Sequence, residues 1–86
     1  MKIKAYVMAS CPYCNMAKEY FQSKGIEFTS VDIEKNRAAS VSIFNRARQT
    51  GVPIREIGVP IIDINGELIL GFDVPKIEET LKRKKS

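Results

Sequence analysis

Two cysteines are the residues of this 86-residue chain whose type and spacing best suit chemistry. Cys11 and Cys14 enclose Pro12 and Tyr13, no other cysteine occurs in the sequence, and histidine is absent. A pair at this spacing can cycle between a dithiol and a disulfide, or its two soft thiolates can bind a metal ion. The neighbouring residues must distinguish a redox site from a metal site.

Pro12 places the pair at the start of a helix, because proline at the first helical position loses no intrahelical hydrogen bond. Cys11 would then be the N-cap, with the backbone N–H groups of Tyr13 and Cys14 directed toward its sulfur. These donors and the positive end of the helix dipole favour a thiolate, which predicts a Cys11 pKa below the usual value of about 8.5. Cys14, one turn further and facing inward, is expected to keep a higher pKa. Cys11 is therefore the predicted nucleophile and Cys14 the predicted resolving thiol.

A metal site built on the same pair is the alternative. Small metallochaperones also present two thiolates between a first strand and a first helix. They usually place a methionine two residues before the first cysteine, whereas Met8 lies three before Cys11. Two cysteines without histidine cannot close a tetrahedral zinc site within one chain. Disulfide exchange is thus favoured over soft-metal binding, and a non-catalytic interaction module would leave the polarised cysteine pair unexplained.

The elements that would position the pair follow from apolar periodicity and turn signals. Asn65-Gly66 marks a hairpin between two strands, and Asp73 is the predicted N-cap of a last helix. Residues 51–59 are expected to be irregular. In chain order the predicted elements are strand 2–8, helix 12–25, strand 26–32, helix 34–50, strands 61–64 and 68–70, and helix 74–84.

This order constrains the topology. Strands joined through a helix are expected to be parallel with a right-handed crossover. This applies to strands 2–8 and 26–32, and likewise to the helical connection from strand 26–32 to strand 61–64. The hairpin makes the fourth strand antiparallel to the third. The expected fold is α/β in the order βαβαββα, a mixed four-stranded sheet packed with three helices. Helical spacing predicts these inward-facing residues: Met16, Ala17, Tyr20 and Phe21, then Ala38, Val41, Phe44 and Ala47, and finally Ile77 and Leu81.

Composition and charge narrow the class of protein. The length predicts a single domain over 1–86, and 44% hydrophobic with 28% charged residues is typical of a soluble globular protein. The net charge of +4 equals the four cations at 82–85, which we interpret as a helix end rather than a nucleic-acid-binding tail. No stretch approaches the roughly 20 apolar residues of a membrane span, and no signal-peptide pattern occurs. We therefore expect a cytoplasmic monomer without nucleic-acid or membrane partners.

Three landmarks together resemble a dithiol glutaredoxin. "CPYC" at 11–14 opens the first helix, Val59-Pro60 opens the third strand, and "GFD" at 71–73 precedes the last helix. The resemblance runs over nearly the whole chain and implies a thioredoxin-like fold of the same element order. It also implies a thiol–disulfide oxidoreductase that reduces protein or glutathione mixed disulfides through Cys11 and Cys14.

The resemblance further implies a glutathione site beside the thiols. Val59 would pair its backbone N–H and C=O with the cysteinyl part of glutathione, next to a cis peptide bond before Pro60. The reaction would need no bound cofactor or metal, only glutathione as reducing co-substrate and disulfide-containing proteins as partners. The implied contacts to the two ends of glutathione are Gly71, Phe72 and Asp73 for the γ-glutamyl end and Tyr13 for the glycyl end.

Two departures from the glutaredoxin pattern concern the electron donor. Many glutaredoxins have a lysine three residues before the first cysteine, where this chain has Met8, and the segment before Pro60 is several residues longer than usual. Both leave open whether glutathione or a thioredoxin-reductase-type donor reduces the dithiol. Pro53, in the other Val-Pro pair, is expected in a loop. Candidates for the missing partner of the glycyl carboxylate are Arg46, Arg48, Gln49 and Arg55, although exposed helix charges are the commoner explanation for such residues.

Overall fold

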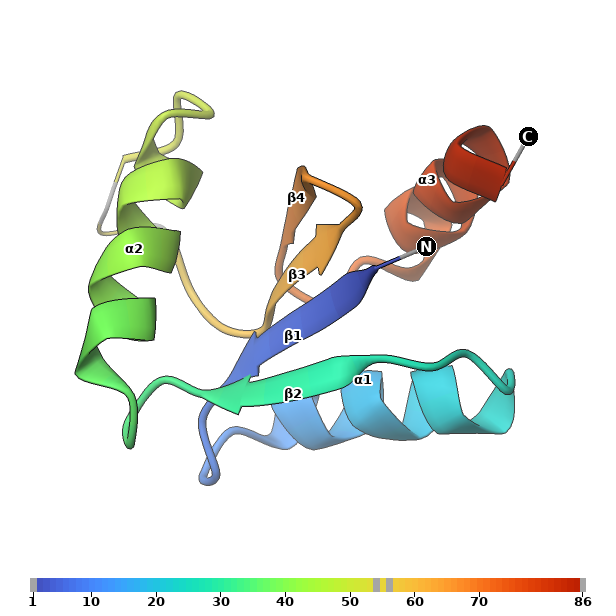
Figure 1. Cartoon of the computed structure of the whole chain (residues 1–86), viewed down its shortest axis with the longest axis horizontal. Helices are drawn as coiled ribbons and strands as arrows, with labels where there is room; N and C mark the ends of the chain where they lie inside the picture. The colour runs from blue at the N-terminus through green and yellow to red at the C-terminus, as the bar shows by residue number, and fades with distance from the viewer. Residues whose placement is uncertain (1, 54, 56, 86) are drawn as a thin grey trace.

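The computed structural model describes residues 2–53, 55 and 57–85 of the chain. Its elements follow one another as β1 (Ile3–Val7), α1 (Pro12–Ser23), β2 (Thr29–Asp32), α2 (Arg37–Arg48), β3 (Ile61–Ile64), β4 (Glu67–Leu70) and α3 (Val74–Lys85) (Figure 1). The predicted βαβαββα order is confirmed. Ile54 and Glu56, within the segment 51–59 that was expected to be irregular, lie outside the described residues.

The four strands form one mixed sheet in the spatial order β2-β1-β3-β4. β1 runs parallel to β2, with Lys4 opposite Thr29, and β3 runs antiparallel to β4, both as predicted. β3 also runs antiparallel to β1, with Ile3 opposite Ile64. The crossover expectation was therefore wrong for the second connection. β3 lies next to β1 on the edge opposite to β2, and it runs in the direction opposite to both strands.

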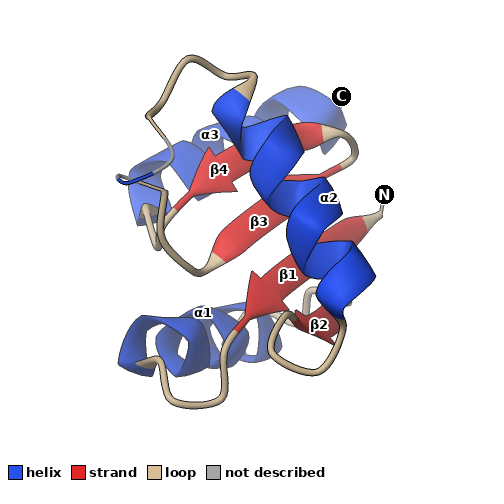
Figure 2. Ribbon diagram, turned by 90° about the vertical axis from the view of Figure 1, so that its left-hand side faces the viewer, coloured by secondary structure: helices blue, strands red, loops and turns tan. Residues whose placement is uncertain are grey.

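The helices cover both faces of this sheet, α2 on one face and α1 and α3 on the other (Figures 1 and 2). Strand alternation directs Ile3 and Ile62 toward the second of these faces, where they pack with Phe21 of α1. Tyr6 points to the opposite face and packs with Ile43 of α2. Full burial of a side chain of this kind stabilises a fold by about 1.5–3 kcal/mol. The packing of Phe21 therefore fixes α1, at whose start the cysteines lie, against one face of the sheet. The packing of Ile43 fixes α2 against the other face.

The inward face of α2 differs in part from the predicted one. Ala47 is buried and Phe44 packs against the core, both as predicted. Ala38 and Val41 were also predicted to face inward, but Ala38 is exposed and Val41 is 55% exposed. The buried residue one turn before Ala47 is Ile43. The helix also begins at Arg37 rather than near residue 34. Apolar residues occur all round this helix, so periodicity alone did not identify Ile43 as an inward-facing residue.

Two further expectations need correction. Met16 was predicted to face inward but is 47% exposed, while Cys14 and Phe21 lie on the buried side of α1. β2 begins at Thr29 rather than at residue 26, because the preceding residues close the end of α1. There the backbone N–H of Ile26 donates to the carbonyl of Phe21 at 2.9 Å.

The predicted hairpin turn and the predicted cap of the last helix are both confirmed. Asn65 and Gly66 have φ angles of 53° and 101°, both positive as a type I′ hairpin turn requires. The Asp63 carboxylate accepts a hydrogen bond from the N–H of Gly66 at 2.8 Å and so supports the turn. At the start of α3, the Asp73 carboxylate accepts from the N–H of Lys76 at 3.3 Å, which confirms Asp73 as the N-cap.

Candidate active site

The dithiol lies where β1 turns into α1. The turn is closed by the backbone N–H of Cys11, which donates to the carbonyl of Met8 at 3.2 Å. Cys11 is the N-cap of α1 with extended backbone angles (φ −90°, ψ 117°), and Pro12 stands at the helix start, as predicted. Both cysteines are free thiols, and Cys11 is partly exposed whereas Cys14 is fully buried.

The surroundings of the Cys11 thiol favour its ionisation. Partial burial raises its pKa, but hydrogen bonds from the Cys14 thiol and from the backbone N–H groups of Cys14 and Tyr13 bring the pKa below its ordinary value. The backbone donors are those expected at a helix start. A larger share of Cys11 is therefore thiolate near neutral pH than of a free cysteine, and the thiolate is the reactive form.

Cys14 has the opposite character. Burial is the main cause that raises the pKa of its thiol to about 11, and the neighbouring Cys11 adds to the rise. The backbone of Met8 and the charge of Lys18 offset part of this effect. Cys14 consequently stays protonated under conditions in which Cys11 ionises.

Sequence reasoning did not assign the residues that bury Cys14. Ala5 and Val7 of β1 form one cluster with it, and Phe28 packs against that cluster. Strand alternation did predict that Ala5 and Val7 point inward, although not that they meet a thiol. Phe28 had only the signal of an ordinary strand residue, because its contact with this cluster joins distant parts of the sequence.

Val59 and Pro60 lie beside Cys11, and the peptide bond between them is cis, as the resemblance implied. The Cys11 thiol donates to the carbonyl of Val59, with Sγ and oxygen 3.7 Å apart. The backbone N–H of Gly71 donates to the carbonyl of Pro60 at 2.8 Å. Hydrogen bonds therefore link three segments that are distant in sequence, which contain Cys11, the Val59-Pro60 pair and Gly71. Pro53 lies outside any strand, as predicted.

The segment 71–73 leads from β4 into α3. Gly71 has a φ of +88°, in the region that favours glycine. Phe72 is partly buried and packs against the core on the α1 and α3 side of the sheet. Asp73 is exposed, and the Tyr13 ring, in the first turn of α1, is 61% exposed. Both side chains are thus accessible to a ligand, and their contacts with glutathione stay predictions.

Arg46 is engaged away from the thiols. Its Nη1 donates to Asp63 Oδ2 at 2.9 Å and its Nη2 to the carbonyl of Gly66 at 3.4 Å. Asp63 stands opposite Lys4 in the sheet, toward the end of β1 that is remote from Cys11. The suggestion that Arg46 replaces the missing lysine was therefore wrong, since an acidic partner in β3 holds its guanidinium. The other candidates stay predictions and are exposed: Arg48, Gln49 and Arg55.

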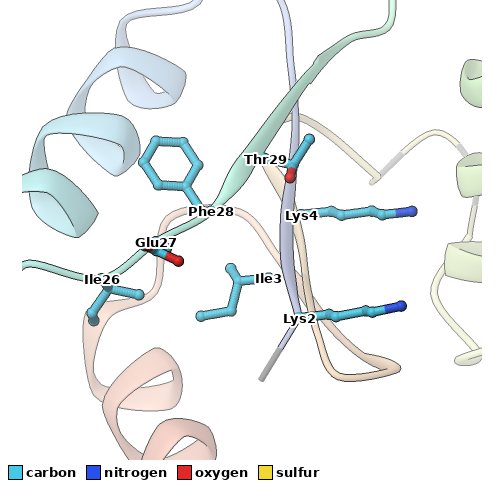
Figure 3. Close-up of a pocket in the computed structure, with 7 residues that line it drawn as sticks. All are labelled: Lys2, Ile3, Lys4, Ile26, Glu27, Phe28 and Thr29. Carbon is cyan, nitrogen blue, oxygen red and sulfur yellow. The ribbon is translucent and has the colours of Figure 1, made fainter.

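A hollow of about 690 Å³ lies beside the start of β1. It is lined by residues 2–4 at the start of β1 and by residues 26–29, which lead into β2 (Figure 3). Lys2 and Lys4 extend from β1 in the direction opposite to Ile3, and Glu27 lies on the same side of β1 as Ile3. None of its lining residues is among the predicted site residues, although Phe28 also packs against the cluster that contains Cys14.

Within residues 2–53, 55 and 57–85, no group of three or more His, Cys, Asp or Glu side chains is arranged to hold a metal ion. A four-coordinate metal ion would need ligands beyond Cys11 and Cys14, whereas a soft ion such as Cu(I) can be bound by two thiolates alone. No helix in this described part of the chain is long and apolar enough to cross a membrane.

Known proteins share both the sequence pattern and the fold. The family model for glutaredoxin matches residues 3–69. An uncharacterised glutaredoxin-like 8.6 kDa protein in the rubredoxin operon of Clostridium pasteurianum is 31% identical over 81 residues, which cover 94% of this chain and 99% of that protein.

Among solved structures, a mutant of the thioredoxin-like protein BC3987 matches with a TM-score of 0.80 at 25% identity, over 94% of this chain and 95% of that one. Escherichia coli NrdH-redoxin, a glutaredoxin-like protein with a thioredoxin-like activity profile, matches in fold with a TM-score of 0.72 at 19% identity, over 92% and 93% of the two chains. The chain therefore belongs to the glutaredoxin family and has a thioredoxin-like fold.

Proposed function

We propose that this protein is a thiol–disulfide oxidoreductase in which Cys11 attacks a disulfide and Cys14 resolves the product. The asymmetry of the pair carries the proposal: Cys11 is partly exposed with a lowered pKa, whereas Cys14 is fully buried with a pKa of about 11. An attacking thiol must reach its substrate and be ionised, and a resolving thiol must stay protonated until a mixed disulfide has formed. Membership of the glutaredoxin family supports the same chemistry.

The reaction proceeds in two exchanges. In the first, the Cys11 thiolate attacks one sulfur of the substrate, a new Cys11–sulfur bond forms, the substrate disulfide breaks, and one substrate thiol leaves. In the second, Cys14 loses its proton and attacks the Cys11 sulfur, which releases the other substrate thiol and leaves a Cys11–Cys14 disulfide. The substrate has gained two electrons and the dithiol has lost them, so an external thiol donor must restore it.

Glutathione is the donor that the family pattern favours. Val59 would hold its cysteinyl part beside Cys11, Asp73 and the adjoining loop its γ-glutamyl end, and Tyr13 its glycyl end. The Val59 carbonyl already lies 3.7 Å from the Cys11 sulfur, which supports this arrangement. The substrates would be protein disulfides or glutathione mixed disulfides, the chain would act as a monomer, and no bound cofactor takes part. We place this reaction in the cytoplasm, where thiol pools are kept reduced.

A thioredoxin-reductase-type enzyme is a second candidate donor. Met8 occupies the position at which many glutaredoxins carry a lysine, and Arg46 is bound to Asp63 instead. Neither residue offers a cation to the glycyl carboxylate of glutathione. The similar fold of E. coli NrdH-redoxin, with its thioredoxin-like activity profile, supports including this donor in the test.

The test is a coupled assay with a glutathione mixed disulfide as substrate. Wild type is compared with Cys11→Ser and Cys14→Ser, each supplied either with glutathione and its reductase or with thioredoxin reductase. Loss of Cys11 should reduce turnover to background with either donor, because no thiolate is left to attack. Loss of Cys14 should leave part of the glutathione-supported rate, because a second glutathione can release the product from Cys11.

The pattern of results separates the alternatives. If only thioredoxin reductase supports turnover and both cysteines are required, the dithiol chemistry stands and the glutathione contacts are wrong. If neither donor supports turnover and the reduced protein binds Cu(I) tightly, the cysteines are metal ligands and the oxidoreductase proposal fails.

A further inference from the structure

Tyr20 connects helix α1 with the loop 71–73, which is hydrogen-bonded to Pro60. Its ring packs edge-on against Phe72, with ring centroids 5.9 Å apart and ring planes inclined by 71°. Its hydroxyl donates to the Glu78 carboxylate of α3 at 3.2 Å. One side chain of α1 therefore contacts both the loop 71–73 and the helix that follows it.

The Tyr20 side chain is itself held in place. Its ring also packs edge-on against Phe21, with centroids 5.6 Å apart, and the Lys24 ammonium lies 5.7 Å from the ring centroid. Burial raises the pKa of the Tyr20 hydroxyl, and Glu78 raises it further. The hydroxyl thus keeps its proton at neutral pH and can donate a hydrogen bond to the Glu78 carboxylate.

The loop 71–73 is fixed at its other side by the sheet. The N–H of Gly71 donates a hydrogen bond to the carbonyl of Pro60 at 2.8 Å. The preceding carbonyl, that of Val59, accepts the hydrogen bond from the Cys11 thiol. The loop is therefore held from the sheet by the Pro60 hydrogen bond and from α1 by the contact of Tyr20 with Phe72, a ring that also packs against the core. Of these two, only the Tyr20 contact depends on side chains.

We propose that Tyr20 is a positioning residue: through Phe72 and Glu78 it holds the loop 71–73 at the distance from Cys11 that a γ-glutamyl-containing mixed disulfide requires. This inference rests on the proposed function, in which the loop receives the γ-glutamyl end of glutathione. A disulfide without that group meets only Cys11 and its immediate neighbours, so it does not depend on where the loop lies. Tyr20 thereby contributes to selection among disulfides rather than to the exchange step itself.

The experiment measures single-turnover reduction by pre-reduced protein, so that no electron donor enters the comparison. One peptide thiol is supplied as its mixed disulfide with glutathione or with cysteamine, which lacks the γ-glutamyl and glycyl groups. Half-saturating concentration and limiting rate are determined for wild type, Tyr20→Phe and Tyr20→Leu. Arg83→Gln is the matched control, because it removes a contact between α3 and Glu67 of β4 and leaves Tyr20 intact.

We expect Tyr20→Leu to raise the half-saturating concentration of the glutathione substrate about threefold to tenfold, the effect of losing an aromatic contact and a hydrogen bond. The limiting rate and both constants for the cysteamine substrate should stay within about twofold. Tyr20→Phe, which loses only the hydroxyl, should show a smaller rise for the same substrate alone. Arg83→Gln should match wild type, and Tyr20→Phe carries the test if Tyr20→Leu does not fold.

Equal changes with both substrates, or no change with either, would overturn the positioning role while leaving the proposed function intact. A wild type that does not distinguish the two substrates would instead refute the glutathione site, and this inference with it. Reduction that persists in Cys11→Ser would refute the oxidoreductase proposal at its centre.

Discussion

Cys11 and Cys14 are chemically alike as free residues, and their positions at one helix start make them different. Cys11 receives hydrogen bonds from the Cys14 thiol and from backbone donors, which lower its pKa in spite of partial burial. Cys14, enclosed by the sheet, has its pKa raised to about 11 chiefly by burial. The proposed order of attack therefore follows from this local difference between the two thiols.

Alkylation of Cys11 should show a lower pH midpoint than a free thiol. As the pH falls through the Cys11 pKa, the thiolate takes up a proton and its rate with iodoacetamide drops; above that pKa the rate levels off. We expect the midpoint below the ordinary value of about 8.5, while Cys14 should react only as the pH approaches about 11. Timed quenching followed by peptide mass spectrometry measures the two sites separately.

The control for this profile is Cys14→Ala. The Cys14 thiol is one of the donors that lower the Cys11 pKa, so its removal should move the midpoint of Cys11 upward. A wild-type midpoint at or above that of a free thiol, or no movement in the variant, would contradict the explanation given for the asymmetry.

The secondary-structure elements place these residues by packing on both faces of the sheet. α1 is held to one face by Phe21, and α2 to the other by Ile43, which is 1% exposed. Val41, two residues earlier in α2, is 55% exposed although its apolar character suggested an inward position. The two side chains therefore differ in energetic importance far more than in chemistry.

A pair of substitutions in α2 measures that difference. Ile43→Ala should lower the free energy of unfolding by about 2–5 kcal/mol, because it removes buried methyl groups and leaves a cavity. Val41→Ala should change it by no more than about 0.5 kcal/mol, as expected for an exposed position. Urea unfolding followed by circular dichroism gives both values. Comparable losses of unfolding free energy in the two variants would show that Val41, and not Ile43 alone, faces the sheet.

Across the molecule, features that depend on neighbouring residues could be predicted from the sequence. The element order, the Asn65-Gly66 turn, the Asp73 cap and the placement of Cys11 at a helix start all follow from short-range rules of backbone geometry. The resemblance to glutaredoxins added the meeting of Cys11 with Val59 and Pro60, which no local rule provides.

Features that depend on residues distant in sequence were missed. The reverse direction of β3, the Arg46–Asp63 ion pair and the contact of Tyr20 with Phe72 and Glu78 each join segments that come together only in the folded chain. Periodicity cannot choose among several partners of this kind, because each helix has more apolar and charged residues than one face can use.

The proposed roles of Cys11 as nucleophile and Cys14 as resolving thiol are tested most directly by trapping the mixed-disulfide intermediate. Reduced wild type, Cys11→Ser and Cys14→Ser are mixed with 2-hydroxyethyl disulfide, a small symmetrical disulfide, and the adducts are located by peptide mass spectrometry. We predict a stable mixed disulfide on Cys11 in Cys14→Ser, a Cys11–Cys14 disulfide in wild type, and no rapid adduct in Cys11→Ser. An adduct that forms first on Cys14, or equally fast in Cys11→Ser, would contradict the assignment of Cys11 as nucleophile.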